Sequence, residues 1–231
     1  MRSTWSHPRR ALGTLALVGC QLTPGSGAVV DRKRPAQSPI VLPAPRRDGK
    51  LSLEAALSRR RSIRSFTNAA LTADQIGQLL WAAQGVTDRE GFRTAPSAGA
   101  LYPLECYVVI GTGTFHYEPG SHRLQPRIGN DLRDELAKAA LDQPAVSEAP
   151  VVVIITAVYE RTARKYGDDR ARRYATLEAG HAAQNLLLEA VALDLGAVPI
   201  GAFDDRRVAQ LLRLDAREAP LYLIPVGHPR P

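Results

Sequence analysis

Residues 94–105 read Thr94-Ala-Pro-Ser-Ala-Gly-Ala-Leu-Tyr-Pro-Leu-Glu105, and the apolar run Cys106-Tyr-Val-Val-Ile110 follows them directly. Two prolines, one glycine and several small residues predict a loop whose backbone can approach a flat ligand closely. The apolar run predicts a strand, in which Cys106 is a small buried hydrophobic residue rather than a nucleophile. This stretch therefore predicts a ligand-holding loop mounted on a sheet.

A second stretch, Arg59-Arg-Arg-Ser-Ile-Arg-Ser-Phe66, stands at the end of a short predicted helix. Guanidinium groups present planar forks of donors, and the serine adds a hydroxyl. This combination suits the dianion of a phosphate monoester. Together the two stretches predict a site for one flat, phosphorylated ligand, which we interpret as flavin mononucleotide (FMN).

The charge of the chain is unevenly distributed. The 231 residues carry a net charge of +7, but residues 1–50 hold nine basic and two acidic groups, whereas residues 51–231 hold 21 of each. The basic character therefore belongs to the N-terminal region, and a nucleic-acid partner is not expected. A hydrophobic fraction of 45% is enough for one sizeable domain. No metal site is predicted.

The N-terminus predicts export. Arg9 and Arg10 precede a short apolar run, and Leu17-Val-Gly-Cys20 resembles a lipoprotein cleavage box in which Cys20 is lipidated. The arginine pair resembles a twin-arginine export signal. The alternative is an unstructured extension with a chance cysteine. We expect an export signal over residues 1–20 and an exported protein that contacts a membrane only through its lipid anchor.

Residues 21–50 contain five prolines and two basic clusters, which predicts a disordered tether. The domain is expected over residues 51–231. Ser52 is its first predicted N-cap, and Thr72 with Gln75 forms a capping box for a helix that stops at Gly85. Further helices are predicted over 130–141 and after Asp204, and strands over 106–111, 114–117, 123–125, 150–157 and 221–226.

The longest predicted helix runs over residues 174–195. Its apolar positions form two stripes, which leave a narrow polar edge at Glu178, Asn185 and Glu189. We expect this helix to be buried nearly all round, by its own sheet and by a second subunit. One stripe comprises Leu177, Gln184, Leu188 and Val191, and the other comprises Ala179, Ala183, Leu186, Ala190 and Leu193.

Four blocks, taken in order, resemble the nitroreductase superfamily, and in particular its SagB-type dehydrogenase branch. They are Arg60-Arg-Ser-Ile-Arg64, Pro96-Ser-Ala-Gly-Ala-Leu-Tyr-Pro103, Glu178-Ala-Gly-His-Ala-Ala-Gln-Asn185 and Val198-Pro-Ile-Gly-Ala-Phe203. The resemblance implies an α+β fold, an α/β/α sandwich around a mixed, mainly antiparallel sheet. It also implies a homodimer with FMN sites at the subunit boundary.

The resemblance assigns FMN contacts to three of these blocks. The cofactor-binding set it implies is Arg60, Arg61, Ser62 and Arg64 toward the phosphate, Pro96, Ser97, Gly99 and Leu101 beside the ring and ribityl chain, and Pro199, Ile200, Gly201 and Ala202 at the flavin N5 edge. Two departures matter. Ala100 and Tyr102 replace the Asn and Gln of many members, and the C-terminus offers only Arg230 as a further cation for the phosphate.

The implied activity is an FMN-dependent oxidoreductase that transfers hydride through N5. Its substrate is a small molecule or is derived from a peptide. Lys165-Tyr166 resembles the pair that removes a proton in azoline dehydrogenases, and we predict Lys165 and Tyr166 as catalytic. The alternative for this charge-rich stretch is a solvated helix surface. The competing function is a non-catalytic exported lipoprotein that uses the same fold as a binding module.

Overall fold

The computed structural model describes residues 38–230, which belong to one compact unit. The predicted export signal, Cys20 and most of the predicted tether therefore lie outside the described residues. Within residues 38–230, no helix combines the length and the apolarity needed to cross a bilayer.

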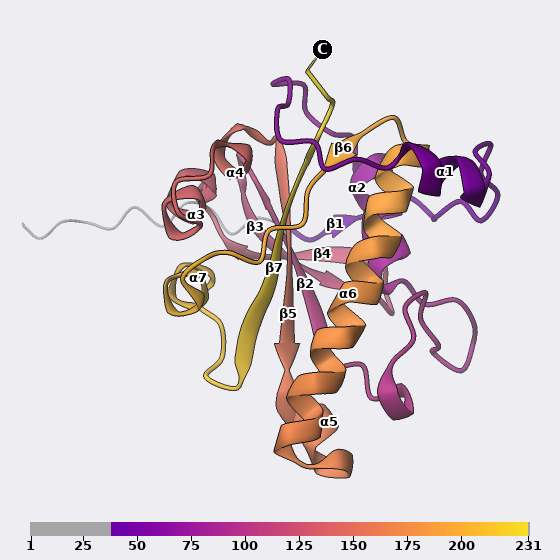
Figure 1. Cartoon of the computed structure of the whole chain (residues 1–231), viewed down its shortest axis with the longest axis vertical. Helices are drawn as coiled ribbons and strands as arrows, with labels where there is room; N and C mark the ends of the chain where they lie inside the picture. The colour runs from indigo at the N-terminus through magenta and orange to yellow at the C-terminus, as the bar shows by residue number, and fades with distance from the viewer. Residues whose placement is uncertain (1–37, 231) are drawn as a thin grey trace, which may run out of the picture. The chain divides into compact units, whose positions relative to one another are not determined.

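One seven-stranded sheet forms the centre of the fold, in the order β1-β4-β3-β2-β5-β7-β6 (Figure 1). Every ladder between these strands is antiparallel, and the parallel pairing is confined to one isolated bridge, between Ser62 and Ala197. The strands are β1 (Ile40–Val41), β2 (Leu104–Ile110), β3 (Gly113–Glu118), β4 (Arg123–Ile128), β5 (Val151–Val158), β6 (Gly196–Ala197) and β7 (Glu218–Gly227).

Helices cover both faces of the sheet, which confirms the α/β/α sandwich (Figure 1). The alternate residues of β5 divide between two cores: Val151, Val153 and Ile155 pack with α2 and α6, whereas Val152 and Ile154 pack with α3, α4 and α7. The helices are α1 (Leu53–Arg59), α2 (Ala73–Gln84), the short 3₁₀ helix η1 (Ala98–Ala100), α3 (Arg133–Ala139), α4 (Pro144–Glu148), α5 (Tyr159–Tyr166), α6 (Asp168–Ala192) and α7 (Asp205–Leu212).

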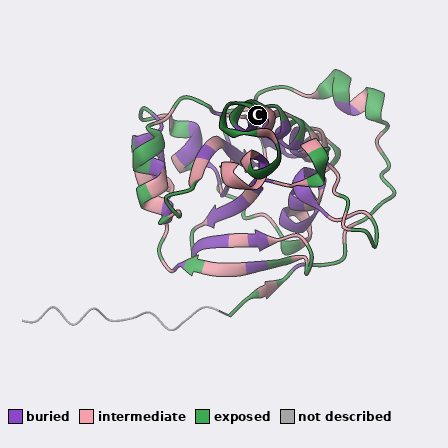
Figure 2. Cartoon of the chain, turned by 90° about the horizontal axis from the view of Figure 1, so that it is seen from below, coloured by how far each residue is buried: buried purple, intermediate pink, exposed green. Residues whose placement is uncertain are grey.

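Burial is concentrated in the strands, and exposed residues lie mainly in the connecting loops and on outer helix faces (Figure 2). β5 is buried along almost its whole length, as its continuous apolar run predicts. Cys106 is also buried, and burial raises the pKa of its thiol to about 12. The thiol is therefore protonated at neutral pH, in agreement with its predicted packing role.

The helix boundaries follow from the predicted caps. The Ser52 hydroxyl accepts from Ala55 N, Thr72 and Gln75 form the reciprocal capping box, and Asp204 accepts from Arg207 N. Gly85 is the C-cap of α2, as predicted. The short elements β1, β6 and α4 were not predicted, and a helix at α5 was considered only as the alternative for a charge-rich stretch.

The packed region begins before the predicted boundary at Leu51. β1 pairs with the edge strand β4, Leu42 is buried, and the backbone of Arg46 exchanges two hydrogen bonds with the Gln78 side chain. The predicted tether of residues 21–50 therefore differs from the structure over its last residues. The proline-rich composition concealed a two-residue strand, which the pairing with β4 stabilises.

α6 is longer than predicted and only partly covered. The stripe through Ala179, Ala183 and Leu186 is buried, as expected. The other stripe is not buried within the chain, because Leu177 is 52% exposed and Gln184 is exposed. One face of α6 therefore lacks a partner among the described residues.

Candidate functional site

The first and last predicted cofactor segments lie side by side. Arg60 ends α1, and two residues later Ser62 bridges Ala197 of β6, while Ile63 N donates to Ala197 O at 3.1 Å. Gly196 makes this approach possible, because a Cβ atom there would lie 2.7 Å from Ile63 Cβ. We call residues 60–64 together with residues 196–202 the arginine half-site.

Most side chains of residues 60–64 face outward. Ser62 and Arg64 are exposed, and the Arg60 guanidinium makes no hydrogen bond to another described residue. Arg61 Nη1 donates to Ser58 O at 2.9 Å and to Arg60 O at 2.8 Å, so this guanidinium covers the last carbonyls of α1. Within the described chain, Arg60 and Ser62 are free to bind an anion, whereas Arg61 must first turn away from α1.

The C-terminal arginine lies beside the same segment. Arg230 N donates to Ser65 O at 3.1 Å, and Arg230 Nη2 donates to Phe66 O at 2.8 Å. Thr67 N also donates to His228 O, so the chain end pairs with the residues that follow Arg64. Arg230 is thus placed next to the arginine half-site.

The loop after β6 presents free backbone donors. Ile200 and Leu223 exchange two backbone hydrogen bonds, of 2.8 and 3.0 Å, which fix the loop on β7. The next residues, Gly201 and Ala202, are exposed, and neither N–H group has an acceptor among the described residues. Pro199, which precedes this pair, is partly buried. These free N–H groups suit an electronegative edge such as that of a flavin ring.

The predicted ligand loop around Gly99 and the predicted catalytic pair, Lys165 and Tyr166, meet at a different place. Gly99 has a φ of 65°, and a Cβ atom there would lie 2.8 Å from Tyr166 Oη and 3.0 Å from Lys165 Nζ. The predicted ligand loop therefore rests on the predicted catalytic pair. We call residues 96–102, Lys165, Tyr166 and the neighbouring Glu178 the loop half-site.

The loop half-site is held by side chains rather than by strand pairing. Tyr102 N donates to Ser97 Oγ at 2.9 Å, and the Arg93 guanidinium lies 4.5 Å from the centre of the Tyr102 ring. Gly99, Ala100 and Tyr102 all have positive φ angles. For the two residues other than glycine, Ala100 and Tyr102, this is backbone strain, which persists only where surrounding contacts enforce it and is concentrated at functional loops. In this loop Pro96 is exposed and Leu101 is partly buried.

α5 carries the predicted catalytic pair and is tied to this loop. Arg161, one turn before Lys165, donates to Tyr102 O at 3.0 Å and forms an ion pair with Glu105 of β2. Lys165 is exposed, and its Nζ lies 5.4 Å from the centre of the Tyr166 ring. Tyr166 in turn packs edge-on against Tyr174 of α6, at 5.2 Å between ring centres.

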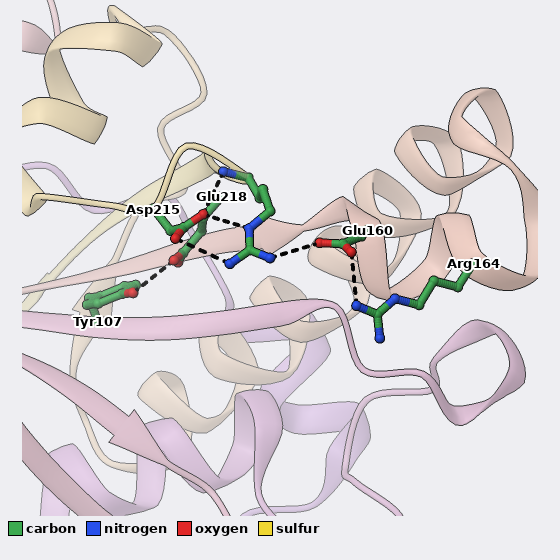
Figure 3. A network of polar contacts seen from close by, with 6 residues as sticks. Tyr107, Glu160, Arg164, Asp215 and Glu218 are labelled. Carbon is green, nitrogen blue, oxygen red and sulfur yellow. Dashed lines mark hydrogen bonds and ion pairs between the residues drawn. The ribbon is translucent and has the colours of Figure 1, made fainter.

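A second network fixes the start of α5 to the sheet (Figure 3). Glu160 accepts from Arg164 at 2.9 Å and from Arg217 at 3.2 Å, and Arg217 also pairs with Asp215 just before β7. These exposed pairs each contribute little free energy, but together they limit the orientations of α5. On the same strand, Glu218 accepts from Tyr107.

Glu105 is the charged anchor of α5 inside the fold. Burial alone would raise the pKa of its carboxyl, but the hydrogen bond from His116 at 2.7 Å and the charge of Arg161 outweigh burial and lower this pKa. Glu105 is therefore ionised at neutral pH and holds Arg161 in place.

Glu178 is the residue of this site that the sequence reading misplaced. Helical periodicity assigned it to a polar edge, yet it is 2% exposed, and burial raises the pKa of its carboxyl to about 7. Ser97 lies near enough to lower this pKa in part, although neither carboxylate oxygen makes a well-formed hydrogen bond to a described residue. Ser97 and Arg93 come from a segment far away in the sequence, and helical periodicity cannot reveal that they approach Glu178.

The two half-sites lie at different levels of α6. Glu178 is 14 residues before the end of the helix at Ala192, and the arginine half-site begins just after that end. At 1.5 Å per residue, this separation is about 21 Å along the axis. Figure 1 shows the same arrangement, with α5 at one end of α6 and α1 and β6 at the other. The four predicted segments thus form two pairs within one chain.

The chain belongs to the nitroreductase family, whose family model matches residues 57–228. A Methanocaldococcus jannaschii protein that also carries a nitroreductase name is 46% identical over 184 residues, which cover 77% of this chain and 91% of that protein. The microcin B17-processing protein McbC of Escherichia coli is 29% identical over 142 residues, and the match covers 56% of this chain and about half, 52%, of McbC.

Solved structures agree with this assignment. A Ralstonia eutropha protein described as a nitroreductase superposes with a TM-score of 0.77 at 30% identity, covering 86% of this chain and 94% of its own. The Escherichia coli microcin synthetase McbBCD complex with truncated pro-MccB17 gives 0.67 at 26% identity, covering 86% and 77%. The NADPH:FMN oxidoreductase of Vibrio harveyi gives 0.60 at 25% identity, covering 78% and 69%. The nitroreductase fold and an oxidoreductase-like family are thereby established.

Proposed function

We propose that this protein is an FMN-dependent oxidoreductase whose complete site forms between two copies of the chain. The observation that carries the proposal is the pairing of the four predicted segments into an arginine half-site and a loop half-site. Family membership supplies the reaction class, and the Vibrio harveyi relative, by its name, acts on FMN. Bound FMN would supply hydride transfer to and from its N5 position.

The arginine half-site fits the phosphate and polar edge of such a cofactor. Arg60 and Ser62 would bind the phosphate as charge-assisted and hydroxyl donors, and Arg61 would join them after leaving the α1 carbonyls. The free N–H groups of Gly201 and Ala202 would donate to the ring edge. Arg64 and Arg230 would add positive charge nearby.

The loop half-site fits the reacting side. Pro96, Ser97 and Leu101 would border the ring, and Lys165 and Tyr166 would face the substrate, with Lys165 removing the proton that accompanies hydride loss. Lys165 is exposed in the single chain. A second subunit and bound cofactor would shield it from water and hold its amine toward the substrate.

A homodimer would bring the half-sites of different copies together. Glu178 and the end of α6 at Ala192 are about 21 Å apart along the axis, so the arginine end and the loop end of the site are separated within one chain. A two-fold related copy can place its loop half-site beside this arginine half-site. Exposed apolar side chains on α1 and α6 support such an interface, namely Leu53 (60%), Leu57 (52%) and Leu177 (52%). A peptide-derived substrate is proposed only through the likeness to McbC, and the lipid anchor at Cys20 stays a prediction.

Flavin retention tests the phosphate assignment. The double variant Arg60→Ala/Ser62→Ala loses hydrogen bonds to the charged phosphate, each of which contributes about 1.5–3 kcal/mol. The Kd for FMN should therefore rise more than tenfold. The measurement is equilibrium dialysis, together with the absorbance and mass of the cofactor that co-purifies. Arg89→Ala removes an exposed arginine elsewhere and is the matched control. Equal flavin content in the double variant and the control would contradict the assignment.

Turnover tests the catalytic pair separately. Lys165→Ala should retain FMN but lose substrate oxidation, because only the proton acceptor is removed. Lys138→Ala, an exposed lysine on α3, is the control and should keep full turnover. If Lys165→Ala oxidises substrate at the rate of the control, the lysine has no part in the reaction.

A further inference from the structure

The loop half-site contains one buried acid that the proposed chemistry does not use. Glu178 lies on α6 near Ser97, and neither of its carboxylate oxygens has a well-formed hydrogen bond to a described residue. A buried carboxyl without partners costs several kcal/mol if it is ionised, so its position requires a physical reason. The loop that carries Ser97 is the neighbour that suggests such a reason, because Ser97 acts on this carboxyl.

Ser97 is the point where this loop closes. Its Oγ accepts from Tyr102 N at 2.9 Å, and its carbonyl oxygen accepts from Ala100 N at 3.0 Å. Both bonds hold residues with positive φ angles. Since a serine hydroxyl has two lone pairs and one proton, Ser97 can accept from Tyr102 and still bond to Glu178.

The closed loop fixes the catalytic end of α5. Gly99 leaves no room for a side chain between itself and the Tyr166 hydroxyl or the Lys165 amine. Arg161, on the same helix, bonds Tyr102 O at the far end of the loop. A movement of Ser97 is therefore transmitted to the surroundings of Lys165.

We propose that Glu178 is a positioning residue, which acts through Ser97 to keep the loop Pro96–Tyr102 closed over Lys165 and Tyr166. The inference deepens the proposed function, on which it rests for the meaning of the catalytic pair. Among the described groups, Ser97 and the Arg93 guanidinium act on the Glu178 carboxyl, and Arg93 lies on the segment between α2 and the loop.

The proton on Glu178 then controls the closure. In the closed loop, burial raises the pKa of Glu178 to about 7 from its ordinary value of 4.5. An open loop hydrates the carboxyl and returns its pKa toward the ordinary value. Between these two values a rise in pH therefore favours opening, by at most about tenfold per pH unit, and above about 7 the effect levels off. Closure takes up a proton in this range.

Amide hydrogen exchange of Tyr102 measures closure without any flavin, because this N–H bonds Ser97 Oγ. In the full-length chain, the protection factor of Tyr102, corrected for intrinsic exchange, should fall as pH rises from 5 to 7 and stay constant from 7 to 8. Glu178→Gln is neutral at every pH and should give a flat, high protection. Because flavin is not needed, this result stands apart from the test of FMN binding.

Glu189→Gln is the matched control. Burial raises the pKa of Glu189 on the same helix, but Gln78 and Arg46 face it rather than the loop, so its variant should keep the wild-type pH dependence. The proposal is overturned if Glu178→Gln keeps the wild-type pH dependence, or if it lowers protection equally at all pH values. If Glu178→Gln does not fold, Ser97→Ala removes the hydroxyl that closes the loop, so the titration midpoint of Glu178 seen by carboxyl NMR should fall toward its ordinary value of 4.5. An unchanged midpoint would overturn the proposal.

Discussion

The two half-sites are built by different kinds of bond. The arginine half-site is fixed by main-chain pairing, through Ser62 with Ala197 and Ile200 with Leu223, and its charged side chains point outward. The loop half-site is fixed by side chains, through Ser97, Arg93 and Arg161. Main-chain pairing tolerates many side chains, whereas a side-chain clamp does not. Substitutions should therefore affect folding at the first half-site only where the backbones touch.

The largest effect is expected where the backbones touch. Gly196→Ala would put a Cβ atom 2.7 Å from Ile63 Cβ, so the pairing of residues 62–63 with β6 must open. Overpacking of this kind costs typically about 1–3 kcal/mol. Urea unfolding measures the loss. Gly201→Ala on the same loop is the control, because its nearest neighbour would be 3.9 Å away. Equal stability of the two variants would break the comparison.

The next effect separates strain from contact in the loop half-site. Gly99→Ala carries a penalty of about 1–2 kcal/mol for a positive φ and also displaces Lys165 and Tyr166. Gly91→Ala carries a similar penalty, at a φ of 86°, but has no atom within 4 Å. Urea unfolding should show similar losses for both, while only Gly99→Ala should lose turnover. Full activity in Gly99→Ala would show that the loop does not position the pair.

The smallest expected effect is a change in how steeply the free energy of unfolding depends on pH. Glu105 has a lowered pKa in the fold, so it contributes stability above its ordinary value of 4.5 and loses this contribution as pH falls through the folded value. Each unit of lowering corresponds to about 1.4 kcal/mol. Glu105→Gln should therefore lose less free energy of unfolding below pH 4.5 than the wild type. The control is Glu118→Gln on β3, in which the part of the pH dependence of the unfolding free energy that comes from Glu105 should remain. If Glu105→Gln and the wild type show the same pH dependence, Glu105 is not the anchor of α5.

Much of the fold could be predicted from local pattern. Capping residues such as Ser52, Thr72 and Asp204 act within one helical turn, so they can be recognised locally. The continuous apolar run of β5 likewise predicts a strand that is buried on both faces. β1 could not be predicted, because a two-residue strand exists only through its pairing with β4. The exposed face of α6 was predicted to be buried, because an apolar helical stripe looks the same in sequence whether it packs in the core of its own chain or against another molecule.

The candidate site shows the same division. The short blocks around Arg60, Ser97 and Gly201 were found because backbone approach needs small residues and phosphate binding needs arginine and serine. Which blocks meet was not predicted, because that depends on the tertiary structure. Glu178 is buried, and the side chains that act on its carboxyl, Ser97 and Arg93, lie about 80 residues earlier in the chain. No helical pattern contains that information.

The length of α6 imposes a limit on how this chain can vary. A single residue inserted between Glu178 and Ala192 would rotate everything after it by about 100° around the helix axis. The carboxyl under Ser97 and the glycine against Ile63 could then no longer both keep their places. Insertions should instead be accepted at the exposed turn around Gly120, where a Cβ atom would meet nothing within 4 Å. The length of α6 therefore fixes the spacing between the two half-sites.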